Sequence, residues 1–230
     1  MMRLFVFIAL VIVKVGFFFV FISNPTTLFS GGSDADFYDA YALGEESLTS
    51  SVWPDWLRAL NEVGLYSRVG VSIFLMVLGV IVIPVLCGRL ALVKGYPYKT
   101  RICLGIAIAI SMYPTLFYYT LDIYRDVFML FVFLSGLLFV KWSIYAVSPL
   151  QKTFYVLVVF AHGYLLYLFR GYLGFAFLIS YLGFFMFRVR KLSFFLHVVP
   201  MLIVLNVFYI LGLFETLMAY RGLFDGVEGD

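Results

Sequence analysis

The sequence has few charged residues for its length. Of its 230 residues only 13% are Asp, Glu, Lys or Arg, and 64% are apolar, whereas a typical soluble domain is about 25% charged. A water-soluble domain is therefore excluded. A disordered or collagen-like chain is excluded as well, because 27 Phe and 17 Tyr stand against only 7 Pro. The remaining class is a polytopic membrane protein.

Other shortages exclude further classes. Two cysteines are too few for a disulfide framework. The formal net charge of +3 is too small to indicate a nucleic-acid partner. The chain also has no phosphate-binding P-loop, no His-Glu-x-x-His, no Cys-x-x-Cys and no glycine-rich dinucleotide turn. The sequence therefore offers no motif for ATP-driven transport by this chain alone.

Hydrophobic runs bounded by charged residues predict seven membrane-spanning helices, since about 20 apolar residues cross a bilayer core of ~30 Å. The predicted spans are residues 4–22, 69–87, two within 102–140, 153–169, 172–187 and 192–214. A turn at Asp122, Arg125 and Asp126 separates the two spans within 102–140, and Pro84 is expected to kink the second span. The predicted fold is an all-α transmembrane bundle that forms a single domain over residues 1–230.

The charges predict the orientation of these spans. With the N-terminus inside, 10 of the 16 basic residues face the cytoplasm and all 13 acidic residues face out. The C-terminus then lies outside. The first apolar run is longer than a signal-peptide core of ~7–15 residues and lacks a small-residue cleavage site, so we expect a retained anchor. Lys14, within that run, should snorkel or meet a carboxylate of another helix.

Residues 23–68 form the one large outer loop, with seven acidic residues against two arginines. Ser33 followed by Asp36 resembles a capping box and predicts the start of a helix. Asp34 and Asp36 are the candidate catalytic residues, because carboxylates just outside the membrane can accept a proton from a sugar hydroxyl or hold a divalent cation. They can equally well stabilise the first turn of the helix through its dipole. Tyr38 and Asp39 are predicted to support them.

A second helix is predicted later in the loop. Its apolar residues recur at helical spacing, with Pro54 in the first turn and Gly64 as a stop. These apolar residues are Trp53, Trp56, Leu57, Leu60 and Val63. Two tryptophans on one side are typical of a helix that lies at the headgroup level of a membrane. Such a helix can roof a lipid-facing groove or simply anchor the loop.

The outer face has arginines and no lysine. The outer arginines are Arg58, Arg68, Arg125, Arg170 and Arg221. Because the arginine side chain binds phosphate with a planar fork of donors, this set indicates a phosphate-bearing ligand. The alternative is that these arginines pair with the outer carboxylates. Spacings of 3 and 4 would place Asp122, Arg125 and Asp126 on one helix face, where they can pair with one another.

The order of these features resembles the C-type, polyprenyl-phosphate-dependent integral membrane glycosyltransferases and the O-antigen and exopolysaccharide polymerases related to them. The resemblance rests on an Asp-x-Asp-like motif after the first span and on later Pro, Arg-acidic and Arg-Gly positions. The segments concerned are 33–38 (Ser-Asp-Ala-Asp-Phe-Tyr), 113–119, 123–126 (Ile-Tyr-Arg-Asp), 168–172 and 220–222. Members of this family usually have more spans, so the C-terminal part of such a fold would be absent.

The resemblance implies a sugar on a polyprenyl phosphate or pyrophosphate as the substrate, at the outer face of a bacterial inner membrane. Arg125, Arg170 and Arg221 would hold the phosphate, with Asp122 and Asp126 supporting them. Asp34 or Asp36 would deprotonate the acceptor hydroxyl. A need for a divalent cation stays open, and no other cofactor is implied. The alternative is a non-catalytic membrane partner or inhibitor of polysaccharide-assembly proteins, or a truncated remnant of such an enzyme.

Overall fold

The computed structural model describes residues 2–23, 33–47, 49, 51–92 and 99–188. These residues form helices and no β-strand, which confirms the all-α prediction for this part of the chain. The chain divides into two compact units, Met1–Phe169 and Arg170–Asp230. The described part of the second unit is the helix α10 (Gly171–Arg188), and the helices below belong to the first unit.

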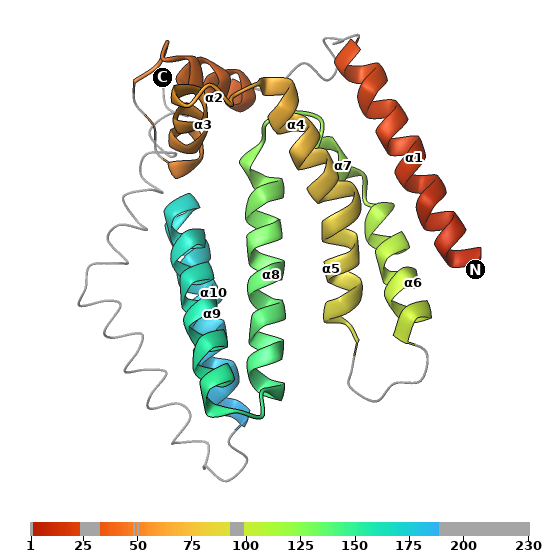
Figure 1. The fold of residues 1–230 in the computed structure, drawn as a ribbon, viewed down its shortest axis with the longest axis vertical. Helices are drawn as coiled ribbons and strands as arrows, with labels where there is room; N and C mark the ends of the chain where they lie inside the picture. The colour runs from red at the N-terminus through yellow and green to blue at the C-terminus, as the bar shows by residue number, and fades with distance from the viewer. Residues whose placement is uncertain (1, 24–32, 48, 50, 93–98, 189–230) are drawn as a thin grey trace, which may run out of the picture. The chain divides into compact units, whose positions relative to one another are not determined.

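Four helices are long and apolar enough to cross a membrane, which supports the assignment as a membrane protein. They are α1 (Met2–Ser23), the continuous helix Arg68–Leu90, α8 (Arg125–Tyr145) and α9 (Pro149–Phe169) (Figure 1). They correspond to the first, second, fourth and fifth predicted spans. The sixth predicted span, residues 172–187, lies within α10, and the predicted span 192–214 lies outside the described residues.

The third predicted span is not a continuous helix. It consists of α6 (Lys99–Ser111) and the short α7 (Pro114–Tyr118). The break follows from Pro114, which disfavours helical backbone at the residue before it, and Tyr113 is accordingly extended, with ψ of 112°. The turn predicted near residue 122 is present, because the chain leaves α7 at Tyr119 and α8 begins at Arg125.

The helix Arg68–Leu90 changes geometry along its length. It begins as α4 (Arg68–Val77), continues as the π-helical turn η1 (Leu78–Val82) and ends as α5 (Ile83–Leu90). The π turn lies just before Pro84, whose ring would clash with the carbonyl four residues earlier in a regular α-helix. Two glycines of this helix lie close to neighbouring segments. A Cβ on Gly79 would meet the side chain of Thr120, and a Cβ on Gly88 would lie 2.5 Å from the backbone oxygen of Cys103. The second contact lets α5 pack closely on α6.

Two basic side chains join helix ends. Lys141 of α8 donates hydrogen bonds from Nζ to the last two carbonyls of α5, Arg89 at 2.7 Å and Leu90 at 3.1 Å, and to the carbonyl of Leu92 just beyond the helix. The last carbonyls of a helix lack i+4 partners, so the ammonium caps the C-terminus of α5. Arg3 donates to the backbone oxygen of Arg101 at 2.7 Å, which ties α1 to α6.

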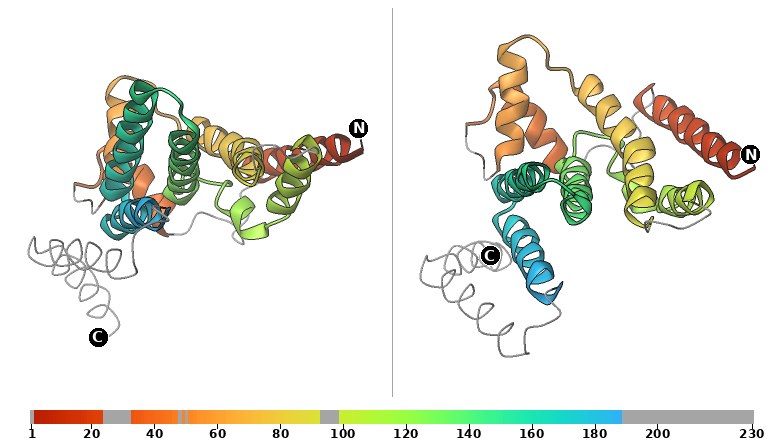
Figure 2. Two further views of the ribbon diagram at one scale, coloured as in Figure 1. Left: turned by 90° about the horizontal axis from the view of Figure 1, so that it is seen from below. Right: turned by 60° about the horizontal axis from the view of Figure 1, so that its bottom comes forward.

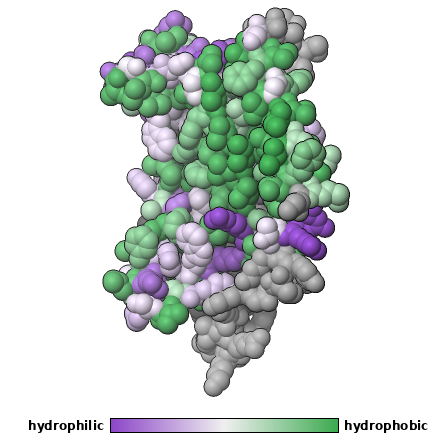
Figure 3. Space-filling model, turned by 45° about the vertical axis from the view of Figure 1, so that its right-hand side comes forward, coloured by the Kyte–Doolittle hydropathy of each residue, from purple (hydrophilic) through white to green (hydrophobic). Residues whose placement is uncertain are grey.

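Helix α1 exposes most of its apolar side chains, and Figure 3 shows a broad apolar surface on the face it draws. Phe18 is an exception, being buried in a small apolar cluster with Met76, Val80 and Leu121. Lys14 meets no carboxylate among the described residues. Its ammonium instead lies 4.8 Å from the centre of the Phe117 ring, where a cation is attracted to the aromatic face.

The segment between α1 and α4 contains α2 (Ser33–Leu43) and α3 (Val52–Glu62), which pack side by side (Figure 2). The helix predicted from Ser33 and the helix predicted around Trp53 are both present. Each is followed by a glycine with positive φ, Gly44 at 86° and Gly64 at 73°. Backbone hydrogen bonds around both glycines close Schellman motifs, which end the helices.

Candidate functional site

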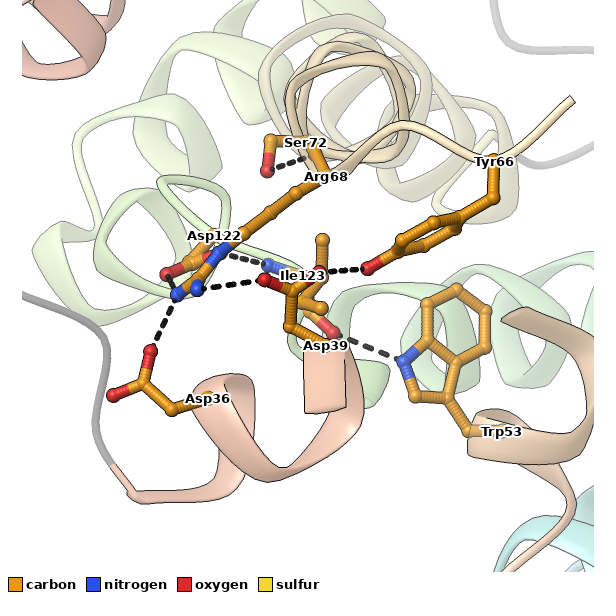
Figure 4. A network of polar contacts seen from close by, with 8 residues as sticks. All are labelled: Asp36, Asp39, Trp53, Tyr66, Arg68, Ser72, Asp122 and Ile123. Atoms are coloured by element: carbon orange, nitrogen blue, oxygen red, sulfur yellow. Dashed lines mark hydrogen bonds and ion pairs between the residues drawn. The ribbon is translucent and has the colours of Figure 1, made fainter. Parts of the chain in front are cut away.

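Arg68 lies between three carboxylates that come from distant parts of the sequence (Figure 4). Its Nη2 is 2.6 Å from Asp122 Oδ2 and 2.8 Å from Asp36 Oδ1, its Nε is 3.0 Å from Asp122 Oδ1, and its Nη1 is 3.3 Å from Asp39 Oδ2. Arg68 is the first residue of α4, Asp36 and Asp39 belong to α2, and Asp122 lies in the turn before α8. We call these four residues the Arg68 cluster.

The carboxylate oxygens of the Arg68 cluster differ in what they bind. Asp122 is only 10% exposed and uses both oxygens, since Oδ1 also accepts the backbone N–H of Ile123 at 2.8 Å. Asp39 uses Oδ2 for Arg68 and Oδ1 for the hydroxyl of Tyr66, which donates at 2.5 Å. Asp36 is 61% exposed, and its Oδ2 has no partner among the described residues. Among the contacts of the described residues, Asp36 Oδ2 is therefore the carboxylate oxygen of the cluster without a hydrogen-bond partner.

Two neighbouring aromatic residues are connected to the Arg68 cluster by hydrogen bonds. Burial, together with its hydrogen bond to Asp39, raises the pKa of the Tyr66 hydroxyl above its usual value. The buried indole of Trp53 in α3 donates from Nε1 to the carbonyl of Ile123 at 2.9 Å. Because Ile123 also donates its N–H to Asp122, α3 is connected to the cluster through one residue.

The predicted catalytic pair is separated by the fold. Asp36 belongs to the Arg68 cluster, whereas Asp34 is exposed in the first turn of α2 and lies outside the cluster. Asp39, predicted as a supporting residue, does lie beside Asp36. Tyr38 is buried, with its ring 6.0 Å from that of Phe37.

The structure describes two of the three predicted phosphate-binding residues. Arg125 is the first residue of α8, and its buried Nε has no hydrogen-bond partner among the described residues. Asp126 follows it in the first helical turn. Arg170, in the second unit, donates to the hydroxyl of Tyr172 at 2.9 Å, and Arg221 lies outside the described residues. The expected pairing of Asp122 with Arg125 on one helix face is wrong, because Asp122 lies in the turn and binds Arg68.

An apolar cleft of about 450 Å³ lies beside the cluster, between α3, α4 and α8. Its walls include Trp53, Trp56, Gly70, Phe74 and Phe128. Helix α3, which the sequence predicted at the headgroup level, thus lines a cleft together with the starts of two candidate spans.

Helices α2 and α3 share further polar contacts. The hydroxyl of Tyr41 in α2 donates to Asp55 Oδ1 of α3 at 2.8 Å, and this hydrogen bond raises the pKa of Tyr41. The guanidinium of Arg58 lies 5.4 Å from the centre of the Tyr41 ring. Asn61 of α3 donates to the carbonyl of Ala42 at 3.0 Å. These contacts hold α2, and with it Asp36, against α3.

Metal ligation was left open by the sequence. Within the described part of the chain, no group of three or more His, Cys, Asp or Glu side chains is arranged to hold a metal ion. In the Arg68 cluster the guanidinium occupies the position between the carboxylates.

The central role of Arg68 was not predicted. The sequence placed it among the outer arginines and offered pairing with carboxylates as one interpretation, but the partners are 29 to 54 residues away. One signal was available: Arg68 stands at the junction between an acidic loop and an apolar span, where a buried cation needs several acceptors.

Comparison of the chain with protein-family models, curated proteins and solved structures gives no significant match.

Proposed function

We propose that the protein transfers a sugar from a polyprenyl phosphate or pyrophosphate carrier at the outer face of the membrane. The observation that carries this proposal is the open oxygen of Asp36 in the Arg68 cluster. A carboxylate that is held at one oxygen and open at the other is oriented for proton transfer. The apolar cleft beside the cluster supports a substrate that has both a hydrocarbon chain and a polar head.

In the proposed reaction, Asp36 Oδ2 accepts the proton of the acceptor hydroxyl. The hydroxyl oxygen forms a bond to the anomeric carbon of the donor sugar, and the bond from that carbon to the carrier phosphate breaks. The electron pair leaves with the phosphate, whose added charge needs a cation nearby. Arg125 is the residue we assign to this role, because its buried Nε lacks a partner and a buried donor is normally satisfied. Arg170 and Arg221 stay candidates for the same role.

The proposed site requires an orientation. We infer that the N-terminus is cytoplasmic and that the chain has seven spans, so that α2, α3 and the Arg68 cluster face out. The distribution of charge supports this, because all 13 acidic residues of the sequence then lie outside. A periplasmic reporter fused at residue 45 should be active and one fused at residue 95 inactive. The reverse result would contradict the orientation.

The non-catalytic alternative is favoured by a different aspect of the same cluster. Arg68 binds three carboxylates that belong to α2 and to the turn before α8, and such a network is also what a purely structural tie requires. If the Arg68 cluster is only structural, the protein would act as a non-catalytic partner or inhibitor of polysaccharide-assembly proteins.

The two interpretations are separated by replacing Asp36 with Asn. A general base cannot be replaced by an amide, so we expect the rate of sugar transfer from a lipid-linked donor to fall by ~10²–10⁴. Asp34→Asn is the matched control, because Asp34 is on the same helix but outside the cluster. Recovery of Asp36→Asn activity by excess Mg²⁺ or Mn²⁺ would assign Asp36 to a metal instead.

Thermal unfolding should be nearly unchanged in both variants, since an exposed ion pair contributes only ~0–1 kcal/mol. If the rate of sugar transfer by Asp36→Asn falls by less than a few-fold, the catalytic assignment is refuted. No transfer by the unmodified protein would favour the non-catalytic alternative.

A further inference from the structure

Lys14 lies deep within an apolar helix. Of the Lys, Arg, Asp and Glu residues of the chain, it is the one that falls inside a predicted span rather than beside it. Helix α1 continues for nine residues after Lys14, to Ser23, which is about 14 Å. A lysine reaches the membrane surface from positions near the end of a helix. The ammonium of Lys14 therefore needs a partner within the apolar layer.

The contact that the fold provides for Lys14 is incomplete. Its Nζ lies 4.8 Å from the centre of the Phe117 ring, and none of the ion pairs of the described residues includes it. An aromatic face attracts a cation but carries no full negative charge. Lys14 is half-buried, and the exposed Phe17 also contacts Phe117, with ring centres 5.7 Å apart. Lys14 thus lies beside a surface that another helix can reach.

The break between α6 and α7 lies at the same level as Lys14. Arg3 binds the carbonyl of Arg101, and α1 and α6 run in the same direction from this contact (Figure 1). Lys14 is 11 residues after Arg3, and Met112 is 11 residues after Arg101, about 16 Å along each helix. Met112 and Tyr113, at the break, are 68% and 59% exposed. Non-helical backbone at membrane depth is covered by protein or lines a water-filled cavity, so two features at one level need a neighbour.

The carboxylate that would pair with Lys14 is not provided by the spans of this chain. All 13 acidic residues lie outside the predicted spans: in the loop 23–68, at the turn within 102–140, or after residue 214. A second copy of the chain has the same spans, so it offers no carboxylate at this depth either. A partner at the level of Lys14 must therefore be a different protein.

We propose that the surface between α1 and the α6–α7 break binds a transmembrane helix of another protein, which carries an Asp or Glu near the middle of the membrane. The carboxylate accepts hydrogen bonds from Nζ of Lys14, since charges within a membrane pair with one another. The same helix covers the exposed backbone at Met112 and Tyr113. This inference does not depend on sugar transfer, because it concerns a different surface from the Arg68 cluster.

The test uses synthetic transmembrane helices as probes. Each probe has about 20 leucines between terminal lysines, with Asp, Asn or Leu at the central position, and carries a fluorescent donor. The full-length protein carries the acceptor, and energy transfer is measured in liposomes against the peptide-to-lipid ratio. We expect the Asp probe to associate about tenfold more tightly than the Leu probe, the scale of one charged hydrogen bond. A central Asp has the same depth in either direction of insertion.

Variants of Lys14 test the pairing. Lys14→Met should abolish the preference for the Asp probe, whereas Lys14→Arg should retain it. Lys14→Gln replaces the Met variant if that does not fold. Lys152→Met is the matched control, because Lys152 is exposed in the first turn of α9, and its removal should leave association unchanged. An Asp preference that persists in Lys14→Met, or that is lost equally in Lys152→Met, would overturn the proposal.

The other probes test the chemistry and depth of the partner. Equal association of the Asn and Asp probes would overturn the assignment to a carboxylate. A probe with Asp within one turn of its end should behave like the Leu probe, and association as tight as that of the central Asp would overturn pairing at mid-membrane depth. No preference of the unmodified protein for Asp over Leu would overturn the proposal as a whole.

Two last arms test occupants from this chain itself. Glu215 directly follows the last predicted span and lies outside the described residues. If Glu215→Gln strengthens association of the Asp probe, Lys14 has a partner within its own chain and the assignment to another protein is overturned. Energy transfer between two labelled copies of the protein that disappears in Lys14→Met would overturn it in favour of self-association. Unchanged results in both arms are expected.

Discussion

Replacing Arg68 with Gln should destabilise the packing of α2, α4 and the turn before α8 more than any other single change to the ion pairs of the described residues. The substitution keeps a polar side chain but removes the charge that three carboxylates share. Asp39 and Asp122, at 24% and 10% exposed, would be left with little access to water. An unpaired carboxylate in such a place is costly because neither solvent nor a partner compensates its charge.

The magnitude follows from the burial of each partner. Breaking a buried ion pair costs ~3–5 kcal/mol, and Arg68 is itself 32% exposed, so the low end of that range applies. Asp36 contributes little because an exposed pair is worth ~0–1 kcal/mol. We therefore expect Arg68→Gln to lower the free energy of unfolding by about 3–4 kcal/mol, the sum of these two contributions.

A double-mutant cycle distinguishes the partners. The protein in dodecyl maltoside would be unfolded with SDS, and the loss of helix followed by circular dichroism. The coupling energy of Arg68 with Asp122 should be about 2–3 kcal/mol, the scale of a charged hydrogen bond, and that with Asp36 below ~1 kcal/mol. Arg58→Gln is the control, because Arg58 contacts the ring of Tyr41 and forms no ion pair with a described residue.

Two results would refute this reasoning. A cost of less than ~1 kcal/mol for Arg68→Gln would mean that water reaches Asp39 and Asp122 freely. A coupling to Asp36 as large as that to Asp122 would mean that Asp36 is a structural residue, which would also weaken its assignment as a base.

Three other predictions concern packing and protonation. Gly88→Ala should cost ~1–3 kcal/mol of stability and lower the thermal midpoint, because the added Cβ would lie 2.5 Å from the backbone oxygen of Cys103. An unchanged midpoint would contradict the close packing of α5 on α6. Lys141→Met should cost ~1–3 kcal/mol in the SDS assay, since the last carbonyls of α5 lose a charged donor, whereas Lys141→Arg should retain part of the stability. For Tyr66, whose pKa is raised by burial and by Asp39, the stabilisation is complete below the unfolded-state pKa of ~10 and is lost as the pH rises towards the folded-state pKa. The unfolding free energy of the unmodified protein should therefore fall more steeply above pH ~10 than that of Tyr66→Phe, and parallel curves would show that the phenol is freely ionised.

The parts of the fold that the sequence predicted well depend on local signals. The helix around Trp53 was identified from its periodic apolar residues, and its end from Gly64, which adopts positive φ in the structure. The turn before α8 was identified from charges between two apolar runs. In contrast, the break at Pro114 was not predicted, because the length and charge of the run 102–140 indicate how many spans it holds and not where a helix within it is interrupted.

The candidate site was predicted only in part, because it depends on contacts between distant residues. The sequence selected Asp34 and Asp36 together, since both lie in the first turn of the same predicted helix, and only the fold distinguishes them by bringing Arg68 to Asp36. It also paired Asp122 with its near neighbour Arg125, whereas the actual partner is 54 residues away. Periodicity gives the face of a helix, but it does not give the element that packs against that face.

The π turn η1 sets the direction of the two halves of one helix. Gly79 and Gly88 both make close contacts with the segment 99–120, through Thr120 and Cys103. At ~3.6 residues per turn, the nine steps from Gly79 to Gly88 amount to two and a half turns, so a regular α-helix would point the two residues about 180° apart. The wider i→i+5 turn accommodates one additional residue, which reduces this angle to about 80°. The π turn thus brings the two glycines towards one side of the helix, where Gly79 lies against Thr120 and Gly88 against Cys103 of α6.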